Sequence, residues 1–282
     1  MNLAQLKEQY IQELKDLYET REIESLFEMV IEEILQLHRM EISFKKKEPI
    51  EEDDENECIL ILEALKTKQP IQHILGHAWF CGRKFKVNQD VLIPRPETEE
   101  LVHWIIQSVN KTNQIELLDI GTGSGCIPIS LQLALPNASI NAIDISTKSL
   151  SIAKENAILH SSKIQFDQMD ILATELLDKN YDVIVSNPPY IPEKEKSAMH
   201  GNVLEYEPHL ALFVPDEDPL VFYRKITLLA SKHLHQNGLL FFEIHYDQAG
   251  ALQKIIRSLG FEVEIRKDIY GQDRMIKARK IS

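Results

Sequence analysis

The feature that most constrains the fold of this chain is a glycine-rich turn between a strand and a helix. Residues 115–120 form a short apolar run, and Gly121, Gly123 and Gly125 follow before a helical pattern begins at residue 126. Glycine allows a positive φ and lets the backbone approach another group closely. The first turn of a helix has free N–H groups. This order of elements predicts an α/β domain with a ligand site at the carboxyl end of the strand.

The region after residue 115 continues to alternate strands with helices. Short apolar runs bounded by turns predict strands at 115–120, 139–143, 164–168, 181–186, 238–244 and 261–265. Three- and four-residue apolar spacing predicts helices at 126–134, 147–160, 217–235 and 247–259. Such alternation favours a mostly parallel sheet that is covered by helices on both faces.

The N-terminal region has a different pattern. Apolar residues recur at helical spacing through residues 3–40, and a second helix is expected to begin near Glu51. The next segment alternates and contains Gly76 and Gly82, which predicts a β-hairpin before a helix over 97–109. We therefore expect a helical domain at 1–75, a β-hairpin linker at 76–92 and the α/β domain at 93–282.

The composition excludes several classes of protein. With 282 residues, 44% hydrophobic and 27% charged, the chain can bury a substantial core. No run of 18 apolar residues occurs, so no membrane span is expected, and charges interrupt the first residues too often for a secretory signal. The 3 cysteines are widely spaced and form no Cys-x-x-Cys pair, so we expect no metal site. This usage is typical of a reducing compartment and predicts a cytoplasmic protein.

The negative charge is concentrated in the first 75 residues. The whole chain has a formal net charge of −13, and residues 1–75 contain 9 Lys and Arg against 18 Asp and Glu. Such a surface repels a phosphate backbone, so we expect no direct contact with nucleic acid. It is either an ordinary solvated helical surface or a docking surface for a basic protein, and charge alone does not distinguish between the two. Nothing in the sequence requires more than a monomer.

An acidic residue on the next strand pairs with the glycine turn. Asp144 follows Gly123 by 21 residues and can accept hydrogen bonds from ribose hydroxyls. The spacing Gly-x-Gly-x-Gly differs from the dinucleotide fingerprint. Asp119, just before the turn, is unfavourable for a pyrophosphate and favourable for an ammonium group. A tight turn without a ligand is the alternative, but the strand context favours S-adenosyl-L-methionine. The motif resembles the first motif of class I S-adenosylmethionine-dependent methyltransferases.

The predicted strand 181–186 leads directly into Asn187, Pro188, Pro189 and Tyr190. A planar NH₂ group is a poor nucleophile because its lone pair is delocalised. The Asn187 side-chain oxygen and the Pro188 carbonyl can accept its two hydrogens and direct the lone pair at a methyl group. Tyr190 can cover the flat group. Alone, these four residues are more often a rigid turn; after a glycine turn and at a strand end, they indicate catalysis.

Other segments resemble one family over nearly the whole chain. They are Leu-Ile-Pro-Arg-Pro-Glu-Thr-Glu at 92–99 and the segments at 72–80, 207–212, 223–226 and 270–274. With the Asn-Pro-Pro-Tyr loop they resemble the peptide chain release factor glutamine methyltransferase family, also called HemK or PrmC. The resemblance implies a Rossmann-like, seven-stranded methyltransferase sheet, joined by a hairpin to a small all-helical N-terminal domain. It also implies methylation of the side-chain amide nitrogen of the Gln in the Gly-Gly-Gln motif of class 1 peptide chain release factors, modulating translation termination.

The resemblance also implies roles for individual residues. Asn187, Pro188, Pro189 and Tyr190 would hold the substrate Gln. The cofactor would contact Asp119, Gly121, Thr122, Gly123, Ser124, Gly125, Asp144, Asp170, Ile171 and Asn187. Asp170 falls where an adenine contact is expected, but Ile171 stands where the family often has an aromatic side chain.

Several neighbouring residues have less specific expectations. Arg95 and Glu97 either cap a helix start or belong to a segment that closes over the cofactor. Trp79 and Phe80 are expected to pack in the hairpin. His245 is expected to be a structural histidine on the far side of the cofactor domain.

Two other functions stay open. The same chemistry could act on adenine in DNA or RNA, which the acidic N-terminal region and the lack of a basic cluster disfavour. The chain could also be a non-catalytic binding module with a cofactor fold, which the intact Asn-Pro-Pro-Tyr loop disfavours. Methylated Gln in a release factor, methylated adenine in a nucleic acid, or neither would distinguish the three.

Overall fold

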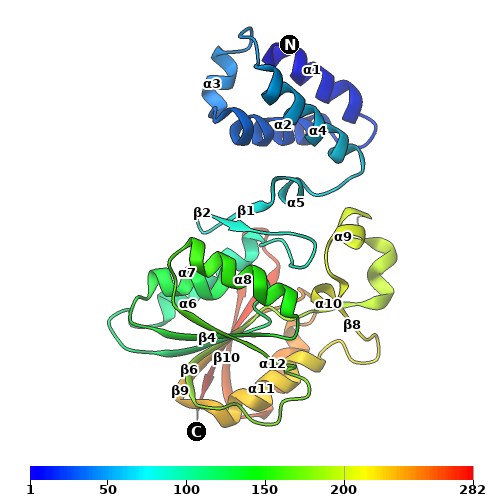
Figure 1. Cartoon of the computed structure of the whole chain (residues 1–282). Helices are drawn as coiled ribbons and strands as arrows, with labels where there is room; N and C mark the ends of the chain where they lie inside the picture. Colours follow the sequence, from blue (N-terminus) through cyan, green and yellow to red (C-terminus); the bar gives the residue numbers. More distant parts are fainter. Residues whose placement is uncertain (200, 282) are drawn as a thin grey trace. The chain divides into compact units, whose positions relative to one another are not determined.

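The computed structural model describes residues 1–199 and 201–281 and divides into two compact units (Figure 1). The first unit is Met1–Gly76 with residues 201–206, and the second comprises His77–Met199 and residues 207–281. The predicted end of the helical domain at 75 lies next to this division. The hairpin that follows belongs to the second unit. The sequence pattern did not indicate that 201–206 packs with the first unit.

The first unit is helical and has a single apolar core. Its helices are α1 (Leu3–Leu14), α2 (Thr20–Leu35), α3 (Arg39–Phe44), α4 (Glu52–Lys66), α5 (Ile71–Leu75) and α9 (Gly201–Tyr206). The expected helical stretch over 3–40 was wrong in being continuous, since Gln36 takes a left-handed φ of 54° and ends α2. Tyr10 is fully buried, and its hydroxyl donates to the Cys58 carbonyl at 2.5 Å. Tyr206 donates to the Thr67 carbonyl at 2.9 Å and so attaches α9.

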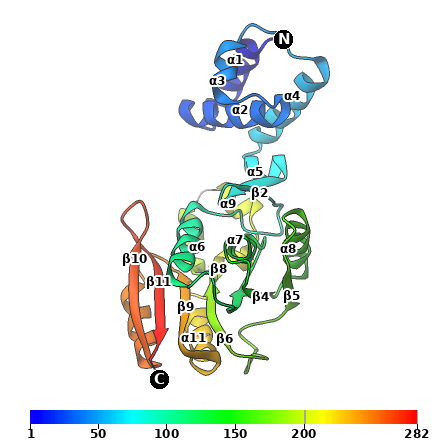
Figure 2. The same ribbon diagram turned by 90° about the vertical axis from the view of Figure 1, so that its left-hand side faces the viewer.

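The second unit is built on a seven-stranded sheet in the order β10-β11-β9-β6-β3-β4-β5, seen side by side in Figure 2. The strands are β3 (Glu116–Ile120), β4 (Ser139–Asp144), β5 (Ile164–Gln168), β6 (Tyr181–Ser186), β9 (Leu234–Glu243), β10 (Phe261–Lys267) and β11 (Asp273–Lys280). All neighbouring pairs from β9 to β5 are parallel, and β11 is antiparallel to both its neighbours. The predicted α/β fold is confirmed. The seventh strand, β11, was missing from the pattern-based prediction.

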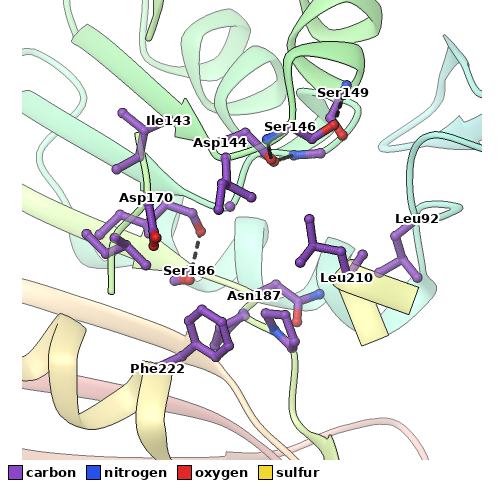
Figure 3. A pocket seen from close by; sticks show the side chains of 18 of the residues that line it. Leu92, Ile143, Asp144, Ser146, Ser149, Asp170, Ser186, Asn187, Leu210 and Phe222 are labelled. Carbon is purple, nitrogen blue, oxygen red and sulfur yellow. Dashed lines mark hydrogen bonds between the residues drawn. The ribbon is translucent and has the colours of Figure 1, made fainter. Parts of the chain in front are cut away.

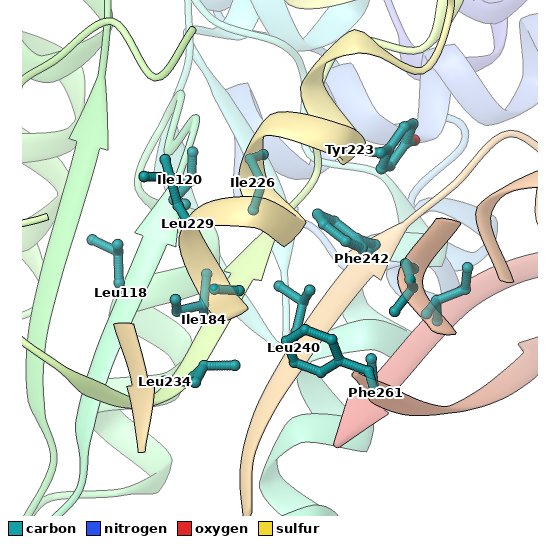
Figure 4. Packing of buried hydrophobic residues seen from close by; sticks show 14 of the residues in the cluster. Leu118, Ile120, Ile184, Tyr223, Ile226, Leu229, Leu234, Leu240, Phe242 and Phe261 are labelled. Atoms are coloured by element: carbon teal, nitrogen blue, oxygen red, sulfur yellow. The ribbon is translucent and has the colours of Figure 1, made fainter. Parts of the chain in front are cut away.

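Helices cover both faces of this sheet, as the alternation of strands and helices predicts. They are α6 (Pro96–Ser108), α7 (Cys126–Ala134), α8 (Thr147–Leu159), α11 (Val221–His233) and α12 (Ala249–Ser258). Successive residues of a strand point to opposite faces. Phe242 accordingly packs with Tyr223 and Ile226 of α11 (Figure 4), while Phe241 packs with Trp104 of α6.

The chain changes winding direction between β3 and β6. From β3 it proceeds outward through β4 to β5, and then returns to place β6 on the other side of β3. Ligands of open α/β sheets bind outside the carboxyl ends of the strands at such a switch point. The glycine turn after β3 and the Asn-Pro-Pro-Tyr loop after β6 both lie at this edge.

Shorter elements complete the second unit. The predicted hairpin is present as β1 (His77–Phe80) and β2 (Arg83–Lys86). Phe80 packs as expected, but the same expectation for Trp79 was wrong, since the alternation leaves its side chain 59% exposed beneath Lys84. The sequence pattern did not predict β7 (Ile191–Pro192), η1 (Glu193–Ala198), α10 (His209–Leu212) or β8 (Phe213–Val214).

Within the described residues, no helix is long and apolar enough to cross a membrane. The same residues contain no group of three or more His, Cys, Asp or Glu side chains that could hold a metal ion.

Candidate active site

A cavity opens at the carboxyl edge of the sheet, at the switch between β3 and β6 (Figure 3). Its wall comes from the loops that follow β3, β4, β5 and β6, from the segment before α6, from the first turn of α8, from residues 208–211 at α10 and from α11. The predicted site residues in the wall are Gly121, Gly123, Asp144, Asp170, Ile171, Asn187, Pro188 and Pro189. The fold therefore brings most of the predicted site together from four separate strand ends.

The three glycines of the turn have different surroundings. Gly121 and Gly123 have φ values of 77° and 54°, and a Cβ at either would meet no atom within 4 Å. Both line the cavity, so their missing side chains leave room for a ligand against the backbone. A Cβ on Gly125 would instead lie 3.1 Å from the Ala153 Cβ of α8. Gly125 allows close packing of helices, and neither it nor Thr122 or Ser124 lines the cavity.

Asp144 ends β4, and its carboxylate is held from both sides. Its Oδ2 accepts from the Gly123 N–H and its Oδ1 from the Ser146 N–H, each at 2.9 Å. Burial raises its pKa, and the backbone N–H groups oppose that shift. Each carboxylate oxygen retains acceptor capacity after one hydrogen bond. The side chain lines the cavity and can therefore accept from a pair of hydroxyls (Figure 3).

Asp119 lies just outside the cavity, because the wall begins with the residue that follows it in the sequence. It is completely buried and outside the wall, and neither carboxylate oxygen has a hydrogen-bond partner among the described residues. Burial raises its pKa to about 7 against the lowering effect of the nearby Thr122 hydroxyl, and the neighbouring Asp144 charge adds to the rise. Buried acceptors normally have a donor. A positive group of a ligand above the glycine turn would stabilise the charged carboxylate, which fits the predicted ammonium.

The loop after β5 gives the cavity a mixed wall. Asp170 is exposed, and its Oδ1 accepts from the Leu172 N–H at 2.9 Å. Ile171 is 7% exposed and supplies an aliphatic surface at the position where the family often has an aromatic side chain. Phe222 and Ile226 of α11 also line the cavity. The sequence prediction missed both, because helical spacing marks them as core residues and gives no indication of a site.

Asn187 and the two prolines enter the cavity wall directly after β6. The Asn187 Nδ2 donates to the Thr98 Oγ1 at 3.4 Å. Tyr190 turns away from the wall, and its hydroxyl donates to the Glu243 Oε1 at 3.5 Å. Burial raises the Tyr190 pKa, so this hydroxyl stays protonated. Tyr190 therefore lies behind the loop here and does not form the lid over the acceptor group that the sequence suggested.

The segment before α6 leads into the helix and adjoins the cavity, although Arg95 makes no side-chain cap and neither Arg95 nor Glu97 lines the wall. α6 begins at Pro96, with Glu97 in its first turn. Arg95 forms an ion pair with Glu207, whose carboxylate is nearly inaccessible, with 2.5 Å between the Arg95 Nη2 and the Glu207 Oε1. Glu207 also accepts from the Ile93 N–H at 3.2 Å. The ion pair fixes this segment beside the cavity, where residues 90–92 form part of the wall.

The structure also places residues near the site that the sequence prediction put elsewhere. His245 was expected on the far side, but its ring centroid lies 5.9 Å from that of Tyr190, and its Nδ1 lies 2.5 Å from the Asp247 Oδ1. Glu243, two residues earlier, is buried behind Asn187 and accepts a hydrogen bond from Thr98 at 2.6 Å. The positions of His245 and Glu243 follow from the predicted strand over 238–244, since the carboxyl end of this strand lies at the same edge of the sheet as that of β6.

A sheet with this winding and a glycine turn facing a cavity are typical of a methyltransferase, and the comparisons with known proteins identify this class. The family model described as the methyltransferase small domain matches residues 101–207, and the one described as the PrmC N-terminal domain matches residues 5–76. A methyltransferase from Pyrococcus furiosus has a similar solved structure, with a TM-score of 0.52 over 71% of this chain and 89% of that one. At 17% identity, this likeness concerns the fold alone.

The sequence relatives are more specific. The release factor glutamine methyltransferase of Flavobacterium psychrophilum is 46% identical over 281 residues, which span 98% of this chain and 99% of the relative. That of Bacteroides thetaiotaomicron is 41% identical over 271 residues, which span 95% of this chain and 97% of the relative. The chain belongs to the release factor glutamine methyltransferase family, and the resemblance drawn from the sequence is confirmed.

Proposed function

We propose that this protein transfers a methyl group from S-adenosyl-L-methionine to the side-chain amide nitrogen (N5) of the Gln in the Gly-Gly-Gln motif of class 1 peptide chain release factors. One observation carries the proposal. Asn187, Pro188 and Pro189 share a cavity wall with Gly121, Gly123 and Asp144. The residues that can accept hydrogen bonds from a substrate NH₂ and the residues that can bind a nucleoside thus line the same cavity. Transfer of a group between two bound molecules requires such proximity.

The cofactor portion of the cavity fits the chemistry of S-adenosyl-L-methionine. Asp144 would accept hydrogen bonds from the ribose hydroxyls while Gly123 and Ser146 hold its carboxylate. Ile171 and the neighbouring apolar wall would contact the adenine, with Asp170 at its polar edge. The buried charge of Asp119 would favour the amino group. When bound, the cofactor supplies an electrophilic methyl group on a sulfonium.

The acceptor side works by orientation. The Asn187 Oδ1 and the Pro188 carbonyl accept one hydrogen each from the substrate amide NH₂, which aims the nitrogen lone pair at the methyl. The nitrogen gains positive charge during transfer, so these acceptors bind the transition state more strongly than the ground state. A strong base is not required, because the methylated amide nitrogen is strongly acidic and passes its extra proton to solvent water as the product leaves the cavity. The apolar wall around the prolines excludes water from the reacting groups.

The N-terminal helical unit is proposed to dock the release factor. Its first 75 residues combine 18 acidic with 9 basic side chains, and α4 begins with Glu52, Asp53, Asp54 and Glu55. Neutralising these four to Gln and Asn should raise the KM for intact release factor and leave the KM for a short Gly-Gly-Gln peptide unchanged. An equal effect on both substrates would remove this surface from docking. The enzyme is proposed to act as a monomer in the cytoplasm, where release factors act.

The test of the function is product analysis. The protein is incubated with S-adenosyl-L-methionine and either a purified class 1 release factor or adenine-containing DNA and RNA. The proposal requires one added methyl group on the Gly-Gly-Gln peptide of the release factor. Methylated adenine with an unmodified release factor would establish the alternative acceptor and overturn the proposal.

A further inference from the structure

The proposed function, on which this inference rests, requires the Asn187 carboxamide to face the substrate with its oxygen. A carboxamide has an acceptor oxygen and a donor NH₂ of nearly the same size. If the group turned over, its NH₂ would point at the substrate NH₂, and no hydrogen bond could form. The fold must therefore fix which end of Asn187 faces the cavity.

Two buried side chains behind Asn187 supply such a constraint. Thr98 and Glu243 are 3% and 2% exposed, and neither lines the cavity. The Thr98 hydroxyl donates its single proton to the Glu243 Oε2 at 2.6 Å. A hydroxyl that already donates its single proton can only accept a hydrogen bond from any other neighbour. The Asn187 Nδ2, at 3.4 Å, meets this requirement by donating.

The sheet itself places these groups together. Asn187 follows β6, Glu243 ends β9, and the two strands are parallel neighbours with Ser186 opposite Phe242. Thr98 belongs to the first turn of α6, above the same edge. The arrangement thus depends on three separate elements of the second unit.

We propose that Glu243, acting through Thr98, is a positioning residue that orients the Asn187 carboxamide with its oxygen toward the substrate. The separation of 3.4 Å is long for an N–H···O hydrogen bond. Catalytic hydrogen bonds of a free enzyme are often long and shorten when substrate binds. Loss of one orienting bond should reduce kcat by about 10- to 100-fold.

The direction of the two hydrogen bonds depends on the charge of Glu243. A protonated Glu243 could donate to Thr98, and Thr98 would then be free to donate to the Asn187 oxygen, which reverses the carboxamide. Burial raises the Glu243 pKa to about 7. The groups that act on it, besides the Thr98 hydroxyl, are Arg274 of β11, Arg95 and Glu97 at the start of α6, and the Tyr190 hydroxyl. The kcat should therefore fall as the pH drops through about 7.

The kinetic test compares Thr98→Val with Thr98→Ser. Thr98→Val keeps the shape and removes the hydroxyl, so kcat should fall about 10- to 100-fold while the Kd for S-adenosyl-L-methionine stays close to wild type. The Tm should also fall, because the buried Glu243 carboxylate loses its hydrogen-bond donor, so kcat is measured well below the Tm of each variant. Thr98→Ser should restore kcat. Thr227→Val is the matched control, because it removes another buried hydroxyl, which donates within its own helix to the Tyr223 carbonyl at 2.6 Å. Wild-type kcat in Thr98→Val would overturn the proposal.

Two further readouts separate this proposal from a purely structural role. Glu243→Gln should abolish the fall of kcat near pH 7, and an unchanged pH profile would contradict the relay. The side-chain NH₂ signal of Asn187, observed by NMR after ¹⁵N-asparagine labelling and assigned with Asn187→Ala, should titrate with the same midpoint in the free enzyme. It should no longer do so in Thr98→Val.

The NMR measurement also separates the inference from the proposed function. It needs no acceptor substrate, so an enzyme that failed to methylate any release factor would overturn the proposed function and still report on the relay. A signal that does not titrate in the wild type would overturn the relay even if glutamine methylation were demonstrated.

Discussion

Asp144→Ala should weaken cofactor binding far more than it slows turnover. In the structure the Asp144 carboxylate is fixed by the Gly123 and Ser146 N–H groups and faces the cavity. Two hydrogen bonds from ribose hydroxyls to a charged acceptor are worth about 1.5 kcal/mol each. Their loss, about 3 kcal/mol, corresponds to a Kd roughly 100-fold higher. The kcat at saturating cofactor should change by less than about threefold, because Asp144 does not contact the acceptor nitrogen.

The assay is isothermal titration of S-adenosyl-L-methionine into the variant and the wild type, followed by turnover at saturating cofactor. Asp167→Ala is the control, because this carboxylate on β5 lies outside the cavity wall and accepts from Gln165 at 2.9 Å. It should bind like the wild type. An unchanged Kd in Asp144→Ala would refute the assignment of Asp144 to the ribose, and an equal loss in the control would show that the effect is not local.

Three further outcomes follow from the site. Asn187→Ala should lower kcat by about 100-fold or more with the Kd for S-adenosyl-L-methionine within about threefold, as transition-state acceptors require; parallel loss of both would count against that role. Gly125→Ala should lower the Tm, measured by calorimetry, because the new Cβ would lie 3.1 Å from that of Ala153 and its φ of 79° is strained; a wild-type Tm would contradict this packing. The free energy of unfolding of the ligand-free protein should fall as the pH rises from about 4 to about 7 and level off above that, since burial raises the Asp119 pKa to about 7 and between these values the native carboxyl holds a proton that the unfolded one has lost. Urea titrations check the sign, and Asp119→Asn should reduce the slope.

The periodicity of the sequence predicted the sheet better than it predicted the helical unit. Apolar runs identified β3, β6 and the end of β9 because these segments are buried and largely apolar. In β4, β5 and β10 polar residues interrupt the apolar ones, and the flanking turns helped to identify these strands. β11 was not predicted because five of its eight residues are charged, and its apolar residues Met275, Ile276 and Ala278 form neither a run nor a regular alternation. The helical region was taken as continuous since spacing alone does not reveal a left-handed residue such as Gln36.

The site was predictable where a motif requires a backbone shape or a reactive group. Gly121, Gly123, Asp144 and Asn187 reach the cavity as expected. Gly125 shows the limit of a motif, because its packing against α8 depends on tertiary contacts.

Residues that act from behind the wall were not predictable in the same way. Thr98 and Glu243 lie 145 positions apart and meet through the register of β6 and β9 and the placement of α6. A single sequence gives no indication of such a pairing.

The most direct test of the account is transfer of labelled methyl from S-adenosyl-L-methionine to a class 1 release factor. It is run beside a release factor whose Gly-Gly-Gln glutamine is changed to Ala, and each acceptor is tested with wild-type enzyme and with Asn187→Ala. The account predicts label in the unaltered release factor and none in the altered one, with an initial rate lowered about 100-fold or more when Asn187→Ala replaces the wild-type enzyme. Equal label in the altered release factor, or a wild-type initial rate in Asn187→Ala, would contradict glutamine methylation in this cavity.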